Sequence, residues 1–508
     1  MDFNIDRRKL LKATGAGIAT ATVVSGKAGA VTADDLPGNG TEQNPYEIST
    51  FEQLLAIDDI GLSANYILTD NIEFDGGTPM TPLAFDSSGY GASDPFFGTL
   101  DGQGYEIRNL EIEGGTYYDG AGLFGYIGDG GVVKNLSLVN ISVSGEGKVG
   151  TVAGVFQGGA DGEIRNVSVT GEVQGLNRGT GGLVGEMDSG TIAESDTSAT
   201  VSGTYTLGGV LGYLYGGEVT QTYATGDVGP AFESSPGRVS GFVGYMSGGS
   251  ISLSFATGAS SGGGDVGGFV GQLRDGSITK AYARGDVTGI GVEAGPLGGF
   301  AGSVGGFGEA GSVEEVYSTG AVTDGYGGGL IGEFNPPQVG SVSPLSSHAN
   351  NTYWDIPASG RETSDGGTGL GDIDDTPPAD QMTGDDAPDN MLGFDFENTW
   401  VAVTGDEDAI IGFRPAGTEV QIQATQPNGP GYPVFGWQLG EDEKTCIDRR
   451  NLGRGQEDEE CEFDRDIERG GSRRELDRQT GRGGDGEHID SDTSRRDRGR
   501  GSRRGNGR

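Results

Sequence analysis

Basic residues are the most informative candidates for chemistry, because they are scarce in a sequence with 75 acidic and 33 basic residues. Between residues 179 and 360 the basic residues are Arg238, Arg274, Lys280 and Arg284. The last three lie close together, beside Asp275 and Asp286. Enzymes that cleave polysaccharides on a β-helix use paired carboxylates, or a carboxylate with a basic residue. The cluster is therefore the best catalytic candidate, and ion pairing in an acidic protein explains it equally well.

Metal-ligating residues form no recognisable pattern. His348 is the one histidine before the C-terminal tail. Asp101-Gly102-Gln103-Gly104 and Asp70-Asn71 could join a calcium site, but neither matches a known loop. Cys446 and Cys461 lack the further ligands of a zinc site, although a disulfide between them suits an exported chain. We therefore expect no cofactor, no metal and no catalytic residue.

Aromatic residues recur at one fixed position and are the candidate binding residues. They are Tyr223, Phe255, Tyr282 and Tyr317. Strict alternation from an apolar residue four positions earlier would point them inward, as core. The small residues that follow them (Ala224, Ala256, Ala283 and Ser318) suggest instead a corner that turns the aromatics outward. Inward burial is the preferred interpretation, because a phenylalanine among tyrosines suits a half-dry site. An outward row would form a platform for sugar rings or for a partner's apolar surface.

A repeat of about 30 residues must position these side chains. Its clearest phrase is Gly268-Phe269-Val270-Gly271, and Gly154-Val155-Phe156-Gln157 reads as a degenerate copy. The leading glycines stand at 122, 154, 182, 209, 241, 268, 299 and 329. A second half carries an apolar residue at its third position: Ile164, Ile192, Val219, Ile251, Ile278 and Val313. Self-similarity at this period indicates a solenoid or propeller.

The composition of each repeat favours short strands joined by sharp corners. No run is long enough for a helix, and β-branched and aromatic residues alternate with glycines. One coil buries too little apolar surface to be stable alone, so neighbouring coils must stack. A propeller blade would need four strands in 40–50 residues. The sequence therefore predicts an all-β fold, a right-handed parallel β-helix of about eight glycine-rich coils with an N-terminal helix and strand cap.

The glycine phrase, with a trailing Ala-Thr-Gly-Asp-Val as at 224–228, resembles the GLUG-motif repeat of bacterial and archaeal surface and secreted proteins. The likeness covers about 121–333. The flanks, among them 44–48, 98–102, 353–355 and 431–434, also resemble those of such proteins. The resemblance implies a cell-surface, adhesin-like β-solenoid. It brings no catalytic residues, because the repeat has none.

Five segments are expected along the chain. Residues 1–30 read as a twin-arginine signal peptide, with Arg7-Arg8 before an apolar stretch. Residues 31–120 would form the N-terminal cap and first coils, with a capping box at Ser49 and Glu52, and 121–333 the repeats. Residues 334–440, which hold all three tryptophans, would form a C-terminal cap with long loops, or a tryptophan-lined sugar site. Residues 441–508 are charged and should be disordered.

The charge of the body indicates its surroundings. Residues 31–440 carry 54 acidic and 11 basic residues, a net charge of −43. Molar salt shortens the Debye length to about 3 Å, and excess carboxylates then keep a protein soluble. We therefore expect a halophilic protein, and no nucleic-acid binding by the folded body, because phosphate contacts need basic patches.

The resulting functional expectation is a non-enzymatic, secreted or cell-surface solenoid for adhesion or for envelope or matrix interaction. A polysaccharide or a cell-surface glycoprotein is the expected partner, and no transmembrane segment is expected. The alternative is a β-helical polysaccharide lyase or glycoside hydrolase.

Overall fold

The computed structural model describes residues 31–85, 94–114, 119–231, 237–291, 294–306, 310–335, 348–403, 410–413, 419–421 and 431–438. These residues all belong to one compact unit, Met1–Arg454. The expected signal peptide (1–30), the expected disordered tail (441–508) and the two cysteines lie outside the described residues. In the described part of the chain, no helix has the length and apolar character needed to cross a bilayer.

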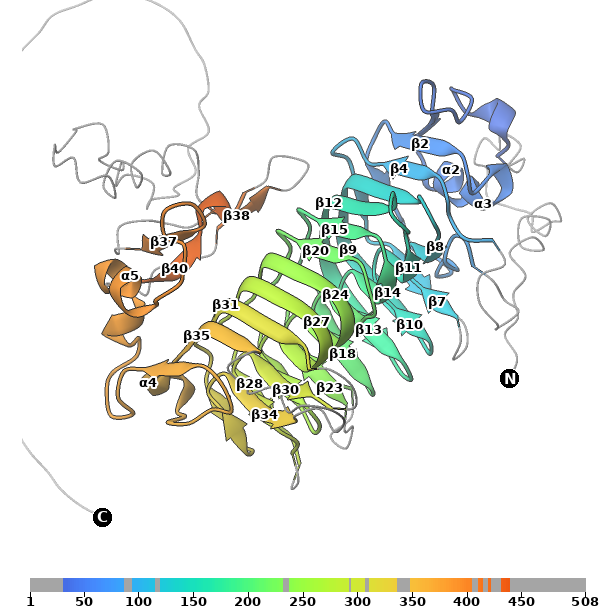
Figure 1. The fold of residues 1–508 in the computed structure, drawn as a ribbon. Coiled ribbons are helices and arrows are strands. Elements are labelled where there is room, and N and C mark those ends of the chain that lie inside the picture. The colour runs from blue at the N-terminus through green and yellow to red at the C-terminus, as the bar shows by residue number, and fades with distance from the viewer. Residues whose placement is uncertain are drawn as a thin grey trace, which may run out of the picture. The chain divides into compact units, whose positions relative to one another are not determined.

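Parallel strands stack into a β-solenoid, as the all-β prediction required (Figure 1). A parallel eight-stranded sheet holds one short strand from each coil. Its strands are β7 (Gly120–Ala121), β10 (Lys148–Val149), β13 (Gly179–Gly181), β18 (Thr206–Gly208), β23 (Arg238–Ser240), β26 (Val266–Gly267), β29 (Leu297–Gly298) and β33 (Gly327–Gly328). The predicted number of about eight coils is confirmed.

The glycine phrase follows each of these short strands and leads into a longer one. The strands that follow it are β8 (Phe124–Ile127), β11 (Ala153–Gln157), β14 (Val184–Ser189), β19 (Leu211–Leu214), β24 (Val243–Ala256), β27 (Val270–Ala283), β30 (Ala301–Gly305) and β34 (Ile331–Asn335). A Cβ on Gly268 would lie 2.2 Å from the carbonyl oxygen of Gly299 in the next coil. The phrase therefore needs glycine because successive coils approach each other through their backbones.

The register corrects one copy of the repeat. Ala153 pairs with both Phe124 and Val184, so Gly154 aligns with the last glycine of the phrase and not with the first. The true copy is Thr151-Val152-Ala153-Gly154, whose first position is held by threonine. A search for leading glycines could not find it.

The second half of each coil completes the large sheet. Its strands are β9 (Val132–Gly145), β12 (Glu163–Gly175), β15 (Thr191–Ala193), β16 (Asp196–Thr197), β17 (Thr200–Gly203), β20 (Glu218–Thr220), β21 (Tyr223–Ala224), β22 (Val228–Pro230), β25 (Ser260–Gly262), β28 (Val287–Gly289), β31 (Ser312–Ser318), β32 (Val322–Thr323) and β35 (Ala349–Asp355). Ile251 pairs with Ile278, and Ile278 with Val313. The predicted apolar row therefore runs through the core, beside the buried Val270.

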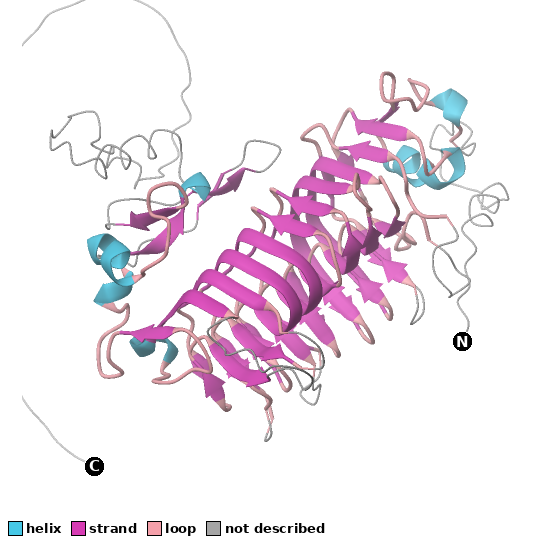
Figure 2. Cartoon of the chain, viewed as in Figure 1, coloured by secondary structure: helices cyan, strands magenta, loops and turns pink. Residues whose placement is uncertain are grey.

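In the described part of the chain, two short α-helices and six strands precede the repeats, after a 3-10 helix at Ala33–Asp35 (Figure 2). They are β1 (Tyr46–Ile48), α2 (Phe51–Leu55), α3 (Ile57–Ile60), β2 (Asn65–Leu68), β3 (Ile72–Glu73), β4 (Thr99–Asp101), β5 (Glu106–Arg108) and β6 (Glu111–Glu113). The capping box lies one residue later than expected: Thr50 accepts a hydrogen bond from the Gln53 backbone. Leu54 and Ile57 are buried in the core of the solenoid.

The C-terminal part leaves the coils after β36 (Thr368–Leu370). It contains α5 (Ala387–Asn390) and an antiparallel pair of β37 (Trp400–Val403) with β40 (Gly431–Phe435). A second antiparallel pair joins β38 (Ile410–Phe413) to β39 (Glu419–Gln421), and α4 (Ile356–Ser359) follows β35. We call the described residues between 370 and 438 the cover segment.

Candidate functional site

A left-handed corner decides the direction of the aromatic row. In each coil, one residue two positions before the row has a φ near +50°, namely Asn135, Asn166, Glu194, Gln221, Leu253, Lys280, Glu315 and Asn351. Such a residue breaks the alternation of a strand. The small residues Ala224, Ala256 and Ala283 consequently face the solenoid core. The preferred inward direction is therefore wrong: the chain turns a corner, as the alternative proposed, and the aromatics point away from that core into a separate cluster.

The aromatic residues form a continuous ladder. Tyr223, Phe255, Tyr282 and Tyr317 pair in register, with ring centroids 4.8, 4.8 and 5.1 Å apart and interplanar angles of 3°, 3° and 10°. Tyr353 extends the row in register with Tyr317. Tyr353 was missed because it follows the repeats. The corner at Asn351, two residues earlier, is the local signal for it.

The ladder is buried, although it is outside the solenoid core. It belongs to a second hydrophobic cluster that it shares with the cover segment. Trp437 packs against Tyr223 and Phe255, and Trp400 against Tyr282 and Tyr317. The ladder is thus neither core nor open platform, because the chain covers it with its own tryptophans. A binding role for its four predicted residues stays a prediction.

Hydrogen bonds attach the cover segment to the ladder. Gln438 Nε2 donates to the Tyr282 hydroxyl at 2.8 Å, and the Tyr317 hydroxyl donates to the Pro433 carbonyl. Arg284 lies with its Cζ 4.7 Å from the centre of the Tyr282 ring, and its Nη2 donates to the Tyr317 hydroxyl at 2.7 Å. The same nitrogen donates to the carbonyl of Pro433 at 3.0 Å. Arg284 is therefore an anchor of the cover segment.

The structure does not assemble the catalytic candidate suggested by sequence. Lys280 Nζ lies 3.2 Å from Glu315 Oε2 and 3.2 Å from Thr399 Oγ1, so it also holds the cover segment. Arg274 is on a different strand face, where its Nη1 donates to the Tyr245 hydroxyl at 3.3 Å. Asp275 and Asp286 accept backbone hydrogen bonds from Gly276 and Ala321. Two left-handed residues, Gly276 and Lys280, lie between Arg274 and Arg284, so the chain turns between them.

The oxygen ligands considered for calcium make hydrogen bonds within the fold. Asp101 Oδ1 accepts from the backbone of Gln103 and from Asn135 Nδ2. Asn71 Oδ1 accepts from the backbone of Glu106. Within the described residues, no group of three or more His, Cys, Asp or Glu side chains is placed to hold a metal ion.

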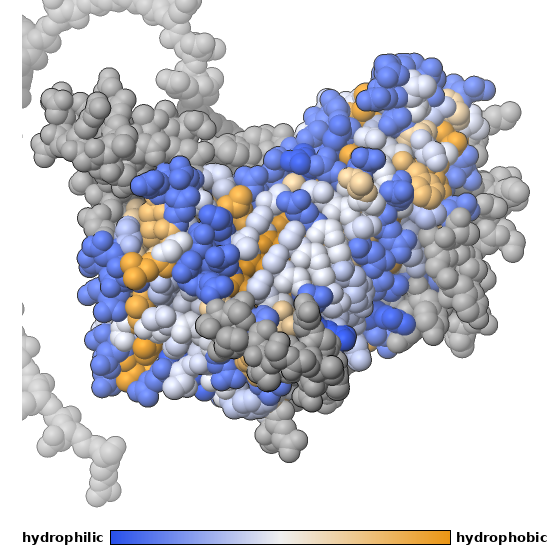
Figure 3. Space-filling model, in the orientation of Figure 1, coloured by the Kyte–Doolittle hydropathy of each residue, from blue (hydrophilic) through white to orange (hydrophobic). Residues whose placement is uncertain are grey.

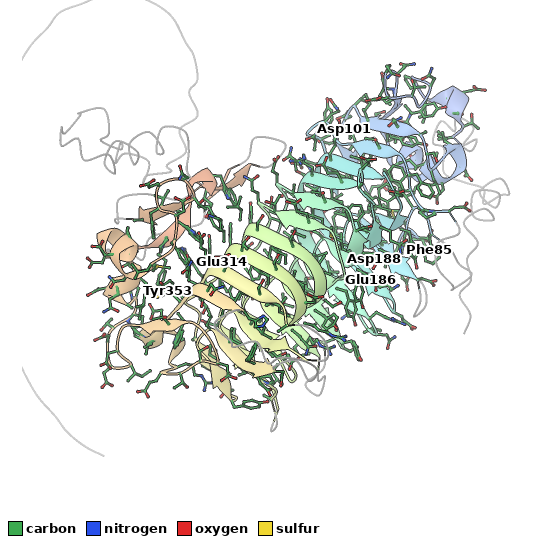
Figure 4. All side chains as sticks on the ribbon, in the orientation of Figure 1. Phe85, Asp101, Glu186, Asp188, Glu314 and Tyr353 are labelled. Atoms are coloured by element: carbon green, nitrogen blue, oxygen red, sulfur yellow. The ribbon has the colours of Figure 1, made fainter. Side chains whose placement is uncertain are left out.

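A second aromatic cluster is open to solvent and was not predicted from sequence. It lies on or next to β19, β24 and β27 and the short strands β13, β18 and β23, and we call it the Tyr–Arg face. Its members are Arg178, Tyr205, Tyr213, Tyr215, Arg238, Tyr245 and Arg274. Tyr205 is 54% exposed and Tyr215 is 41% exposed. Figure 4 shows Glu186 and Asp188, which border this face on β14, away from Glu314 and Tyr353 on the ladder side.

The tyrosines of this face contact one another across neighbouring coils. Tyr213 and Tyr215 stack with centroids 5.6 Å apart and an interplanar angle of 8°. Tyr245 meets Tyr213 edge to face at 5.9 Å and pairs with it in register. The signal in the sequence was Tyr213-x-Tyr215 and Tyr245, both directly after a glycine phrase, where alternation points side chains outward.

Charged groups surround these rings. The Cζ atom of Arg238 lies 4.8 Å from the centre of the Tyr245 ring, a cation–π contact, and its Nε donates to Gln272 Oε1 at 2.7 Å. Burial raises the pKa of the Glu186 carboxyl, and Lys148, at 3.2 Å, offsets part of that effect. Burial also raises the pKa of the Tyr215 hydroxyl, with the Glu186 charge adding to it. The face therefore combines exposed rings with donors and acceptors.

On the side drawn in Figure 3, most of the described surface is hydrophilic or intermediate, and apolar colour is limited to small areas. An amphipathic tyrosine surface such as the Tyr–Arg face suits a ligand that is itself partly polar.

Comparison with known proteins gives partial matches. The chain is 35% identical over 198 residues to halomucin of Haloquadratum walsbyi, a match of 36% of this chain and 2% of halomucin. It is 34% identical over 133 residues to an immunoglobulin A1 protease of Streptococcus pneumoniae, a match of 24% of this chain and 6% of that protein. The chain thus spans a small fraction of these relatives.

Among solved structures, a putative immunoglobulin A1 protease from Bacteroides ovatus is similar with a TM-score of 0.42 and 22% sequence identity. The likeness covers 63% of this chain and 86% of that one. The family model described as the GLUG motif matches residues 262–288, which run from the end of β25 through β27 to β28. The resemblance inferred from the glycine phrase is therefore confirmed: this chain carries the GLUG motif.

Proposed function

We propose that this protein is a non-enzymatic β-solenoid, secreted or held at the cell surface, that binds an extracellular polysaccharide or glycoprotein through the Tyr–Arg face. The proposal rests mainly on the exposure of Tyr215 beside Tyr245, whose ring lies against Arg238 and whose hydroxyl accepts a hydrogen bond from Arg274. Aromatic rings with a polar tip are enriched at binding surfaces because they offer apolar area together with a hydrogen bond.

The ladder is less suited to this role in the present arrangement. Trp400, Phe435 and Trp437 pack on its rings, so a ligand would have to displace the cover segment. Displacement would expose the apolar cluster that the ladder and the cover segment share. The open face needs no such rearrangement.

The same proposal includes export of the protein by the twin-arginine route and a high-salt environment. The support is the Arg7-Arg8 phrase and the net charge of −43 carried by residues 31–440. The partial likeness to halomucin agrees with an extracellular, high-salt setting.

Catalysis on the same face is the alternative, and Glu186 is its best support. A carboxyl whose pKa burial raises, next to a second carboxylate, is the arrangement of a glycosidase acid. Asp188 is that neighbour, and its Oδ2 accepts from Gln157 Nε2 at 2.8 Å. The ion pair with Lys148 argues against this role, because Lys148 stabilises the ionised form of Glu186.

The test measures retention of the whole exported chain on envelope and extracellular-matrix preparations in molar salt. Tyr205→Ala with Tyr215→Ala should reduce retention, whereas Leu392→Ala, which removes a 66% exposed apolar side chain on the cover segment, should not. Reducing-sugar release by the wild type, abolished by Glu186→Gln, would instead establish the enzymatic alternative. Retention of the double tyrosine variant equal to that of the control variant would refute the proposal.

A further inference from the structure

We infer that the ligand of the Tyr–Arg face is an uncharged polysaccharide, a chain of pyranose sugars that carries hydroxyl groups and no ionised groups. This inference rests on the proposed function and adds the chemical class of the ligand. Three properties of the face support it. Its rings are open to solvent, its charges cancel, and its polar groups include both hydrogen-bond donors and acceptors.

The tyrosines provide a surface for the sugar rings. Tyr215 stacks on Tyr213 with centroids 5.6 Å apart, while 41% of Tyr215 remains exposed. Tyr245, in the next coil, pairs in register with Tyr213 and lies 6.3 Å from Tyr215 between ring centroids. A pyranose ring presents C–H groups on its faces and hydroxyl groups at its rim, and a tyrosine offers apolar area together with a polar tip. A polymer that runs along the coils therefore meets a suitable ring in each of these two coils.

The cations at the β14 border of the face have acidic neighbours. Lys148 Nζ lies 3.2 Å from Glu186 Oε1. Burial raises the pKa of the Glu186 carboxyl, Lys148 and Arg178 lower it, and the charge of Asp188 raises it further. Two cations and two carboxylates thus act on one another here.

The two arginines at the Tyr245 ring also have acidic neighbours. Arg238 Cζ lies 4.8 Å from the centre of that ring. Burial raises the pKa of the Asp265 carboxyl, and the charge of Arg238 offsets part of that effect. The hydrogen bond from Arg274 to the Tyr245 hydroxyl raises the pKa of the Arg274 guanidinium, and the charge of Asp275 adds to it. Neither arginine is an unpaired cation that needs an anion from a ligand.

The formal charges of this group add to zero on a body with a net charge of −43 in residues 31–440. The four cations are Lys148, Arg178, Arg238 and Arg274, and the four carboxylates are Glu186, Asp188, Asp265 and Asp275. An ionised ligand group brought against the rings would lose its hydration without meeting an unpaired opposite charge. An uncharged chain avoids this cost.

The polar groups of the face suit hydroxyl groups. Arg238 Nε donates to Gln272 Oε1 at 2.7 Å, and Gln157 Nε2 donates to Asp188 Oδ2 at 2.8 Å. A guanidinium and an amide have further N–H donors beyond one such bond, and a carboxylate has further acceptor positions. A sugar hydroxyl both donates and accepts, so it can bind to either kind of group.

High salt favours the same class of ligand. In 1 M salt the Debye length is about 3 Å, so attraction between exposed charges contributes little to binding. Stacking on rings and hydrogen bonding to hydroxyl groups do not depend on such attraction. In the high-salt environment proposed for this protein, an uncharged ligand therefore loses nothing to screening.

The test is the affinity of the whole exported chain for dextran, mannan and galactan, each compared with its own carboxymethyl and diethylaminoethyl derivatives. The derivatives place negative or positive charge on the same backbone. In salt that preserves the native circular dichroism, we expect at least one uncharged polymer to bind about tenfold more tightly than both of its charged derivatives. Raising the salt from that level should not weaken this binding, because no charge attraction is lost.

Two variants of one tyrosine test the role of the rings. Tyr215→Ala should weaken binding of the uncharged polymer roughly tenfold, whereas Tyr215→Phe keeps the ring and should stay within about threefold of wild type. Leu392→Ala, which removes a 66% exposed apolar side chain on the cover segment, is the control and should not change the affinity. Three results would each overturn the inference: equal losses in Tyr215→Ala and the control, a charged derivative that binds as tightly as its parent, or no binding by any uncharged polymer.

The outcomes also separate the inference from the proposed function. If Tyr215→Ala lowers retention on envelope material while charged derivatives bind better than the uncharged polymers, the face binds glycans and the uncharged class is wrong. If protease treatment of the envelope material abolishes retention, the ligand is attached to protein and the assignment to a polysaccharide is wrong. If Tyr215→Ala changes neither retention nor polymer binding, both the inference and the proposed function are wrong.

Discussion

Gln438 Nε2 donates a hydrogen bond to the hydroxyl of Tyr282 at 2.8 Å, and both side chains are buried. This bond joins the end of the cover segment to the middle of the aromatic ladder. Because it crosses the boundary between coils and cover, the two form one packed structure, and the ladder contributes to stability whatever else it does.

Replacing Tyr282 by alanine should therefore destabilise the protein by about 3–5 kcal/mol, the usual cost of deleting a buried aromatic side chain. Tyr282→Phe keeps the packing but removes the hydrogen-bond acceptor of the buried Gln438 Nε2, which should cost about 1–3 kcal/mol. Thermal unfolding in molar salt measures both. Tyr326→Ala, at an exposed ring, is the control and should stay within about 0.5 kcal/mol of wild type. An unchanged melting temperature for Tyr282→Ala would show that the cover segment does not lie on the ladder in solution.

Removing the charge of Arg284 should release the cover segment without unfolding the coils. Arg284 Nη2 donates to the Tyr317 hydroxyl and to the carbonyls of Tyr432 and Pro433. Hydrogen bonds to a charged group contribute about 1.5–3 kcal/mol, so Arg284→Met should lower the stability of the cover by that amount. Limited proteolysis should then cut between residues 370 and 438 faster, while the coils remain protected. Arg165→Met, on an exposed ion pair, should leave the proteolytic pattern unchanged.

The interior row of the coils was predictable because stacking repeats one environment. Ile251, Ile278 and Val313 occupy identical places in successive coils, so the same side-chain requirement recurs in the sequence. The copy at Gly154 was misplaced because its coil departs from this repetition. Thr151 occupies the first position of the phrase there, so a search for a leading glycine placed the phrase three residues too late.

The direction of the aromatic ladder and its cover could not be read from sequence for physical reasons. The left-handed corner is formed by residues as different as Leu253, Lys280 and Glu315, so no side-chain type marks it. The contacts of Tyr282 with Trp400 and Phe435 join segments far apart in sequence that share no local pattern. The Tyr–Arg face was missed because its residues come from different positions of the repeat: Tyr213 and Tyr245 follow a glycine phrase, whereas Arg238 lies on the short strand before one.

Val270 tests the coil register directly. Its side chain is buried in the core, and its strand neighbours Val243 and Ala301 are in register with it. Val270→Asp would bury an unpaired carboxylate and should unfold several coils together. Thr279→Asp, in the same strand β27 but half-buried, should be tolerated. Cooperative loss of β-sheet circular dichroism in the first variant alone is the expected result, and wild-type melting of Val270→Asp would contradict the register.

Alkaline pH should destabilise the packing around the aromatic ladder before it affects parts of the molecule whose tyrosines are exposed. Burial raises the pKa of the Tyr317 hydroxyl from 10.0 to about 12, partly offset by Arg284, and raises that of Tyr282 as well. The folded state then binds more protons than the unfolded state between these values, so stability is fully present below pH 10 and falls as pH rises toward 12. Tyrosinate absorbance and unfolding should rise together, whereas Tyr317→Phe should reduce the pH dependence. Ionisation of all tyrosines near their ordinary pKa, with no loss of structure, would contradict the buried ladder.

Salt should decide whether the body folds at all. Residues 31–440 carry a net charge of −43, and the Debye length grows from about 3 Å in 1 M salt to about 10 Å in 0.1 M salt. Repulsion among the carboxylates then extends across neighbouring coils, and ion pairs among the described residues, such as Arg108 with Glu106, offset only part of it. Circular dichroism should therefore show progressive loss of β-sheet as salt is diluted from molar to 0.1 M. Replacing the salt by sucrose, which favours compact states without screening charge, should not restore the fold fully. A spectrum that stays the same across this range would contradict the halophilic interpretation, and full recovery in sucrose would show that charge screening is not the cause.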